Sequence, residues 1–246
     1  MRIDILTLFP DAFSNFDTSI IKRAINTKEV EINIHDYREF SPKKNKRVDD
    51  YSYGGGAGMI IEVEPIVNCL RSIPNYEASR KIITSPIGKP YNQKYAKELV
   101  KEDHIIIVCG HYEGIDDRIN HYVDEAISIG DYILTGGEIA AMAIVDSVIR
   151  LIPNVLGNES SIEVESFDDN LLEYPQYTRP EIFEDKLVPE VLLSGNHENI
   201  RKYRRFKSLE RTYKFRPDLL KDAKLNEEDK RFLELIKNGE ELWKNI

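Results

Sequence analysis

Two stretches decide the fold of this chain: residues 104–118 read HIIIVCGHYEGIDDR, and residues 127–138 read ISIGDYILTGGE. In each, a short run rich in isoleucine and valine leads into a glycine-rich turn, which predicts a buried strand that ends in a loop. Glycines at such a strand end let backbone amides and carbonyls approach a ligand without interference from a Cβ atom. Taken singly, each turn is equally consistent with a tight connection that binds nothing.

Similar runs occur throughout the first half of the sequence. They predict strands at residues 3–9, 30–35, 81–84, 104–108 and 123–129. Helix-length segments separate them at residues 17–26, 65–72 and 92–101. The alternation of strand and helix is typical of an α/β domain with a mainly parallel sheet. Because ligands of such sheets bind at the loops that leave the carboxyl ends of the strands, we expect the binding site at the glycine-rich turns.

The second half of the sequence changes character twice. A strongly apolar helix is expected over about residues 138–149, directly after the second turn. Residues 155–180 show little periodicity and predict a long polar connection, whereas the pattern beyond Pro189 is helical again. We therefore expect an α/β domain over residues 1–160, a linker over 161–180 and a small, basic, all-helical domain over 181–246.

The composition excludes several classes of protein. With 41% hydrophobic and 31% charged residues, the chain is an ordinary globular protein and not a disordered one or a coiled coil. Its apolar runs are interrupted well before the roughly 18 residues that a membrane span needs, and the mean hydropathy is −0.44. Residues 1–10 carry Asp4 inside their apolar stretch and no small-residue cleavage site, so they predict a strand and not a signal peptide. We expect a cytoplasmic protein.

The motifs of metal and nucleotide sites are missing. Neither Cys69 nor Cys109 has a second cysteine nearby, so no CxxC zinc site can form, and both are expected to be buried hydrophobic residues. The five histidines show no HxxxH or HExxH spacing, which argues against a tightly bound transition metal. GxGxxG and GxxxxGK[ST] are also absent, which disfavours a dinucleotide-binding fold and a nucleotide triphosphatase.

The charge is distributed unevenly along the chain. A net charge of −9 argues at first against a polyanionic partner. However, residues 201–216 contain eight basic residues and a single acid, Glu210, and aromatic residues lie between them. Because phosphate neutralisation is local, such a segment suits a nucleic-acid contact. The alternative is a solvated helical face whose aromatic side chains pack inward.

Six motifs in a fixed order give a more specific prediction. They are MRIDILTLFPDAF from residue 1, VDDYSYGGGAGM from 48, CGHYEGIDDRI from 109, SIGDYILTGGE from 128, LLEYPQYTRP from 171 and PEVLLSGNHENIRKYR from 189. Together they closely resemble the bacterial tRNA (guanine-N1)-methyltransferases of the SPOUT superfamily, from residue 1 to about 216. The resemblance implies an α/β domain with a SPOUT-type parallel sheet and a deep trefoil knot that binds S-adenosylmethionine. It also implies an obligate homodimer.

The resemblance places the cofactor among the knot loops. The residues that it assigns to the S-adenosylmethionine pocket are Ser85, Pro86, Gly110, Tyr112, Gly114, Ile129, Gly130, Tyr132, Leu134, Gly136 and Gly137. Adenine prefers apolar walls together with backbone donors and acceptors, and Ile129, Tyr132 and Leu134 provide such walls.

The family reaction transfers the methyl group to N1 of the guanine on the 3′ side of the anticodon, tRNA position 37. N1 of neutral guanine carries a proton, so a base must remove it as the attack proceeds, and a carboxylate is the natural candidate. Negative charge then spreads to O6, where a guanidinium can stabilise it. Arg150 stands at the position of the family's catalytic arginine. Its alternative role is that of a cation at the C-terminal end of a helix, where it complements the helix dipole.

This sequence departs from the family at the base. The family has aspartate directly before Ser-Phe, and Glu165 occupies that position here. Glutamate can accept the same proton, but its extra methylene displaces the carboxylate, and about 1 Å of misplacement can cost on the order of 10²-fold in rate. We expect Glu165 to be the base, with Asp169 next. These acids are alternatively solvated charges of the linker. Smaller departures from the family are Ala57, Asn45 and Asn170, where proline, histidine and glycine are common.

The resemblance also implies how tRNA and metal are bound. Mg²⁺ is an expected cofactor, with Glu113 as one possible ligand, although Mg²⁺ sites have no readable spacing. The residues expected to contact the anticodon stem and loop are Tyr177, Arg179, Ser194, Asn196, His197, Arg201, Arg204 and Arg205. Each active site is expected at the interface between two subunits. A non-catalytic tRNA-binding homologue, and a SPOUT methyltransferase that acts on another RNA site, remain the alternatives.

Overall fold

The computed structural model describes residues 1–156, 166–167 and 169–240. The chain forms two compact units, Met1–Glu159 and Ser160–Ile246, which are described separately here. The predicted boundary at residue 160 lies outside the described residues, as does the start of the predicted linker. No helix in the described part of the chain is both long and apolar enough to cross a membrane.

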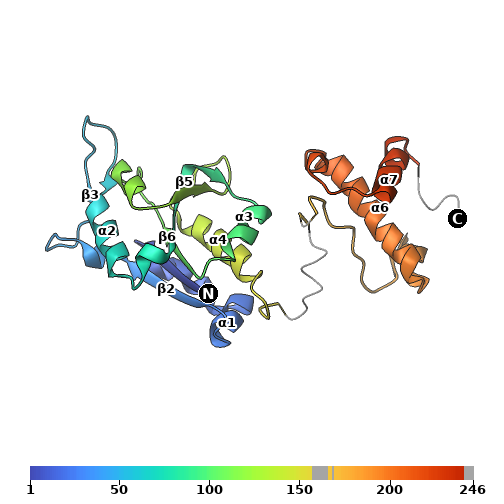
Figure 1. Ribbon diagram of the computed structural model, residues 1–246, viewed down its shortest axis with the longest axis horizontal. Coiled ribbons are helices and arrows are strands. Elements are labelled where there is room, and N and C mark those ends of the chain that lie inside the picture. Colours follow the sequence, from blue (N-terminus) through green and yellow to red (C-terminus); the bar gives the residue numbers. More distant parts are fainter. Residues whose placement is uncertain (157–165, 168, 241–246) are drawn as a thin grey trace. The chain divides into compact units, whose positions relative to one another are not determined.

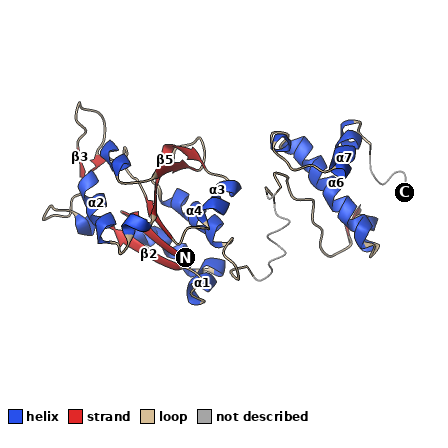
Figure 2. Cartoon of the chain, in the orientation of Figure 1, coloured by secondary structure: helices blue, strands red, loops and turns tan. Residues whose placement is uncertain are grey.

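The first unit is built on a five-stranded sheet (Figures 1 and 2). Its strands are β1 (Arg2–Thr7), β2 (Glu31–Asp36), β5 (Arg80–Pro90), β6 (His104–Val108) and β7 (Glu125–Ser128). Their order is β2-β1-β6-β5-β7, and every neighbouring pair is parallel. The prediction of an α/β domain with a parallel sheet is therefore confirmed.

Helices and short connections complete this unit. The α-helices are α1 (Ser19–Asn26), α2 (Val63–Ser72), α3 (Gln93–Leu99) and α4 (Glu138–Ile149). The 3₁₀ helices are η1 (Pro10–Asp17), η2 (Tyr37–Phe40), η3 (Tyr76–Ala78) and η4 (Asp117–His121). Strands β3 (Asp49–Asp50) and β4 (Ile60–Ile61) form a small antiparallel pair.

The sheet is covered on both faces, because its strands are apolar on both sides. Successive side chains of a strand point to opposite faces, so Ile105 and Ile107 of β6 join one core and Ile106 and Val108 join the other. Helices α1, α3 and α4 pack on the first face, and α2 packs on the second (Figure 1). Cys69 and Cys109 are buried in these two cores as predicted, and burial raises the pKa of both thiols.

Strand β5 is longer than the sequence indicated, because it contains an irregularity. Thr84 and Lys89 both pair with Ile127, so residues 85–88 form an excursion from the ladder. At the end of this excursion a Cβ atom on Gly88 would lie 2.4 Å from the backbone nitrogen of Ile127. Glycine is therefore needed at residue 88 for the two backbones to approach, and the excursion places residues 85–87 outside the sheet.

A buried carboxylate joins three adjacent strands. Asp4 of β1 is fully buried, and its oxygens lie 2.6 Å from His35 Nε2 and 2.7 Å from His104 Nε2. Arg2 Nε also donates to it at 2.7 Å. Burial alone would raise the pKa of Asp4, but the hydrogen bonds from His35, Arg2 and His104 outweigh it and hold the pKa well below the usual range.

The second unit is mainly helical. It contains α5 (Glu190–Leu193), α6 (His197–Phe215), η6 (Leu219–Lys221) and α7 (Glu227–Lys237). A short antiparallel hairpin of β8 (Ile182–Phe183) and β9 (Lys186–Leu187) precedes them. The expectation of an all-helical domain is wrong at this hairpin, because the turn at Glu184 and Asp185 adopts positive φ angles and brings the two short segments together.

Helices α6 and α7 are joined by a buried ion pair. Asp229 is fully buried, and Arg205 donates to its two oxygens at 2.7 and 2.8 Å. Asp229 also accepts from the backbone amide of Asn226, whose side chain in turn accepts from the Asp229 amide, so that the pair forms the capping box of α7. The apolar core beside it contains Phe206 and Phe232.

The Asp4 cluster predicts a pH dependence of stability. The folded-state pKa of Asp4 lies below its ordinary value of 3.8, so its stabilisation is complete above that pH and is lost as the pH falls below it. We expect Asp4→Asn to lower the free energy of unfolding by roughly 2–4 kcal/mol at pH 7, and the difference from the unmodified chain to narrow as the pH falls below about 4. Urea denaturation across this range measures it. The exposed Asp17→Asn is the control, and a gap that does not change with pH would contradict the assignment.

The Arg205–Asp229 pair predicts a structural role for Arg205. Arg205→Gln leaves a buried carboxylate without its partner, and we expect the second unit to lose roughly 3 kcal/mol of stability. Arg204→Gln on the same helix removes a guanidinium that lies over the Tyr174 ring, which is worth less than about 1 kcal/mol at a surface. Hydrogen exchange of α6 and α7 in the full chain distinguishes the two variants. Equal effects would show that the buried pair is not needed.

Candidate functional site

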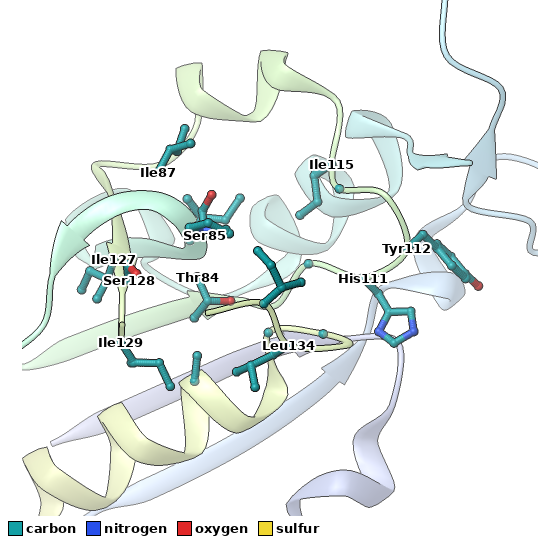
Figure 3. A pocket seen from close by; sticks show the side chains of 18 of the residues that line it. Thr84, Ser85, Ile87, His111, Tyr112, Ile115, Ile127, Ser128, Ile129 and Leu134 are labelled. Carbon is teal, nitrogen blue, oxygen red and sulfur yellow. The ribbon is translucent and has the colours of Figure 1, made fainter. Parts of the chain in front are cut away.

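A cavity of about 430 Å³ lies at the carboxyl ends of β5, β6 and β7. Three loops form it: the excursion of β5, residues 110–115 after β6, and residues 129–137 after β7. Figure 3 shows Ser85 and Ile87 on one side of this cavity, Tyr112 and His111 on the other, and Leu134 between them. The cavity is thus located where ligands bind on parallel sheets, which is the place that the sequence predicted.

The residues expected at the cofactor pocket come together here. All eleven line the cavity: Ser85, Pro86, Gly110, Tyr112, Gly114, Ile129, Gly130, Tyr132, Leu134, Gly136 and Gly137. The cavity wall also includes Thr84, Ile87, Ile115 and Ser128, which the sequence reasoning missed. Ile87 could not be found from the sequence pattern, because the predicted strand ended at residue 84, before the excursion that carries it.

The two glycine-rich loops are joined by backbone contacts. Gly137 N–H donates to Gly110 O at 2.8 Å, and His111 forms an isolated bridge with Gly136. A Cβ atom on Gly137 would lie 2.1 Å from Thr84 Oγ1 and 2.9 Å from the Cα atom of Cys109. Residue 137 must therefore be glycine because the protein's own strands lie too close for a side chain. The sequence had instead suggested the close approach of a ligand as the reason for these glycines.

A buried carboxylate supports the loop after β7. Glu138, the first residue of α4, is only 7% exposed, and Thr7 Oγ1 donates to its Oε1 at 2.8 Å. Thr7 Oγ1 in turn accepts from the Phe9 amide at 2.9 Å. Sequence reasoning did not select Glu138, since nothing nearby in the sequence indicates its partner on β1. This link connects the start of α4 to the end of β1.

The cavity can bind a ligand that is part apolar and part polar. Leu134, Ile129 and Ile115 provide apolar walls, and the backbone of the glycine-rich turns provides donors and acceptors. Ile87 and Ile133 are 80% and 82% exposed at its rim, so apolar surface also extends out of it. This chemistry fits S-adenosylmethionine, which has a flat adenine ring and polar groups at both ends.

Arg150 lies away from this cavity. It is the C-cap residue of α4, it is half-buried, and its backbone amide donates to Asp146 O. The cavity is lined by residues at the opposite end of the same helix, including Gly137 and Ala140. A helix of 12 residues is about 18 Å long, at about 1.5 Å of rise per residue. Within one chain, α4 therefore holds Arg150 and the cavity apart.

The candidate bases are described only in part. Glu165 lies outside the described residues. Asp169 belongs to the second unit, where its side chain is 54% exposed and lies 3.6 Å from Arg205 Nη1. Asp169 is therefore engaged with an arginine that already binds Asp229.

Glu113 is exposed at the cavity and is the one residue singled out for Mg²⁺. In the described part of the chain, no three histidine, cysteine, aspartate or glutamate side chains come close enough to hold a metal ion. Mg²⁺ often binds through one or two carboxylates and the oxygens of a substrate, so Glu113 fits as a single ligand beside such a substrate. The Mg²⁺ requirement stays a prediction.

Several residues expected to contact RNA have partners within the second unit. Ser194 and Asn196 shape the turn before α6, where Asn196 caps the helix by accepting from the Asn199 amide at 3.1 Å, and His197 is the first, exposed residue of α6. Arg201 pairs with Glu198 and Glu228. Both of these acids lie outside residues 201–216, so the basic segment is more neutralised than its own sequence indicated.

Three other expected RNA contacts lie together. Tyr177, Arg179 and Arg204 line a second cavity, of about 610 Å³, which is contained in the second unit.

Comparison with known proteins agrees with the family resemblance of the sequence motifs. Residues 1–222 match the family described as tRNA (Guanine-1)-methyltransferase TrmD. A protein named tRNA (guanine-N(1)-)-methyltransferase from Clostridium botulinum (strain Hall) is 56% identical over 233 residues, which are 95% of this chain and 97% of that protein. Proteins of the same name from Clostridium novyi and Clostridium beijerinckii are each 53% identical, over 96% and 97% of this chain and 98% of each relative. The chain belongs to the tRNA (guanine-1)-methyltransferase family.

Proposed function

We propose that this chain is a tRNA (guanine-N1)-methyltransferase that uses S-adenosylmethionine and acts on the guanine at position 37. The observation that carries the proposal is the first cavity, since every residue that the family resemblance assigns to the cofactor lines it. The family match and the 56% identical relative support the same activity. Because its proposed substrate is tRNA, we also propose that the protein acts in the cytoplasm.

The proposed reaction needs two things from the protein: a site that binds the cofactor and a base that removes a proton. S-adenosylmethionine supplies an electrophilic methyl group when it is bound. The apolar wall at Leu134 and Ile129 would hold the flat part of the cofactor, and the turns after β6 and β7 would present backbone groups to its polar part. The N1 proton of guanine must leave as the new N–C bond forms, and we assign it to the carboxylate of Glu165, with Asp169 as the second candidate. Arg150 stabilises the negative charge that develops on O6.

The fold proposed for the first unit is that of the SPOUT superfamily, with a trefoil knot at the cavity. The contact of residues 110–115 with residues 129–137 supports this, because the two loops meet through the Gly137–Gly110 hydrogen bond and the His111–Gly136 bridge. Glu138 and Thr7 connect the same loops to β1. Such contacts hold crossing segments of chain against one another.

The active site is proposed to be shared between the two subunits of a homodimer. Ala140 lines the cavity of its own chain, and Arg150 lies about 15 Å further along the same helix, at about 1.5 Å of rise per residue. A reaction that needs both a bound cofactor and Arg150 therefore takes its arginine from a second copy. Ile87, Ile133 and Ile139 are 80%, 82% and 53% exposed near the cavity and the start of α4, and a subunit contact would cover such apolar surface.

Methyl transfer is the direct test of the proposed reaction. We expect label from S-adenosylmethionine to reach a tRNA transcript with guanine at position 37 and not the same transcript with adenine there, with a requirement for Mg²⁺. The reason is that only guanine offers a proton at N1 that a carboxylate can remove. Scintillation counting measures it. Binding of tRNA and cofactor without transfer would favour a non-catalytic homologue, and transfer to both transcripts would indicate another RNA site.

Mixed dimers test the sharing of the active site. Leu134→Arg places a charged side chain in the apolar cavity, and Arg150→Ala removes the guanidinium, so each variant alone should be inactive. If the arginine comes from the second subunit, dimers with one variant of each kind regain one complete site and methylate tRNA. Transfer by differently tagged, purified mixed dimers measures this. Inactive mixed dimers would show that each chain supplies its own arginine.

A further inference from the structure

The second cavity belongs to the second unit alone and has a distinct chemistry. Its volume of about 610 Å³ lies within the roughly 300–1,000 Å³ that small-molecule sites occupy. Two tyrosines, Tyr174 and Tyr177, and two arginines, Arg179 and Arg204, line it together with the apolar Leu192. Aromatic rings, guanidinium groups and an apolar wall are thus present around one concave space.

Two of these groups are in contact with each other. The Cζ atom of Arg204 lies 5.0 Å from the centroid of the Tyr174 ring, so guanidinium and ring are in cation–π contact. Tyr177 is 48% exposed, and its hydroxyl is hydrogen-bonded to Tyr203 of α6. Burial and this hydrogen bond raise the pKa of Tyr203. The rings are therefore anchored to α6 while one of them remains accessible.

In the described part of the chain, the two arginines of the cavity lack the carboxylate partners that two other arginines of α6 have. Arg201 and Arg205 form ion pairs with Glu228 and Asp229 of α7. Among residues 1–156, 166–167 and 169–240, neither Arg179 nor Arg204 forms an ion pair with a carboxylate. Two arginines without a carboxylate ion pair among these residues therefore line this cavity, together with one acid, Glu181, and an anion can approach them there.

We propose that this cavity binds one unstacked nucleobase of RNA, from a nucleotide of the anticodon loop other than the guanine that is methylated. This inference rests on the proposed tRNA substrate. Proteins hold splayed-out loop bases by stacking them on aromatic rings and on the planes of arginine side chains, and Tyr174, Tyr177 and Arg204 provide both. Arg179 is placed to bind the phosphate of the same nucleotide.

The occupant is a single nucleotide and not a duplex. All residues that line this concave site belong to the second unit, and a base pair would have to open for one base to stack inside it. Stacking is tolerant of sequence, because every base has a π face. The site should therefore strengthen binding of the loop and fix its position, and it should contribute little to the choice of the methylated base.

A thermodynamic cycle between protein and RNA tests the proposal. The probe is an RNA hairpin with an anticodon stem and loop and guanine at position 37, and abasic sites replace its loop nucleotides one at a time. Fluorescence anisotropy measures its binding to the full chain. Tyr174→Leu removes the ring, Tyr174→Phe keeps it, and Arg204→Lys keeps the charge but loses the plane. Tyr213→Leu is the matched control, because Tyr213 is 41% exposed on α6 and does not line the cavity.

The proposal predicts coupling at one loop position. Tyr174→Leu should weaken binding roughly 5- to 100-fold, as loss of one base–aromatic stack does. One abasic site, at a position other than 37, should cost a similar factor in the unmodified chain and nothing further in Tyr174→Leu. Tyr174→Phe and Tyr213→Leu should bind as the unmodified chain does, and Arg204→Lys should bind more weakly. Circular dichroism checks that each variant is folded.

Three results would overturn the proposal: independent, additive losses at every loop position, coupling at position 37 alone, or no binding of the hairpin. Methyl transfer is measured in parallel, so that failure of the nucleobase site can be distinguished from failure of the proposed reaction. A coupled position without methyl transfer would retain the nucleobase site and reject the proposed reaction. Methyl transfer with additive losses would retain the reaction and reject the nucleobase site.

Discussion

The hydrogen bond from the Gly137 amide to the Gly110 carbonyl is the contact on which the first cavity depends. It brings the start of α4 against the exit of β6, and there is no space for a side chain at residue 137 because Thr84 and Cys109 lie too close. The buried Glu138 extends the same junction to Thr7 of β1. Three strand ends and one helix are thus fixed relative to one another, and the cavity is the space that this junction leaves at the edge of the sheet.

Helix α4 has two roles that follow from its position. Its first residues help to build the cavity, and its last residue precedes Arg150 at the far end. A rigid helix cannot bring its two ends together. The length of α4 that packs in the core therefore also keeps Arg150 away from the cavity within one chain. In the proposed homodimer, the arginine of one copy would act at the cavity of the other, and this separation would be bridged between subunits.

Local patterns predicted much of the fold. Strand β6 and helix α4 begin and end at the predicted residues, because β-branched runs and a glycine-flanked apolar segment are local signals. The continuation of β5 was missed, since the excursion at residues 85–88 depends on the close approach of Gly88 to Ile127. Glu138, Glu228 and Asp229 were missed for the same reason: their partners are distant in sequence. The candidate base Glu165 remains a prediction from the resemblance alone.

The ion pairs between α6 and α7 also affect how strongly salt influences RNA binding. Arg201 and Arg205 already have carboxylate partners. Either arginine would have to separate from its carboxylate before it could bind a phosphate. Counterion release scales with the number of phosphates that unpaired cations neutralise. The logarithm of the affinity for RNA should therefore fall with the logarithm of salt concentration less steeply than eight basic residues would indicate, and the slope reports how many arginines remain available.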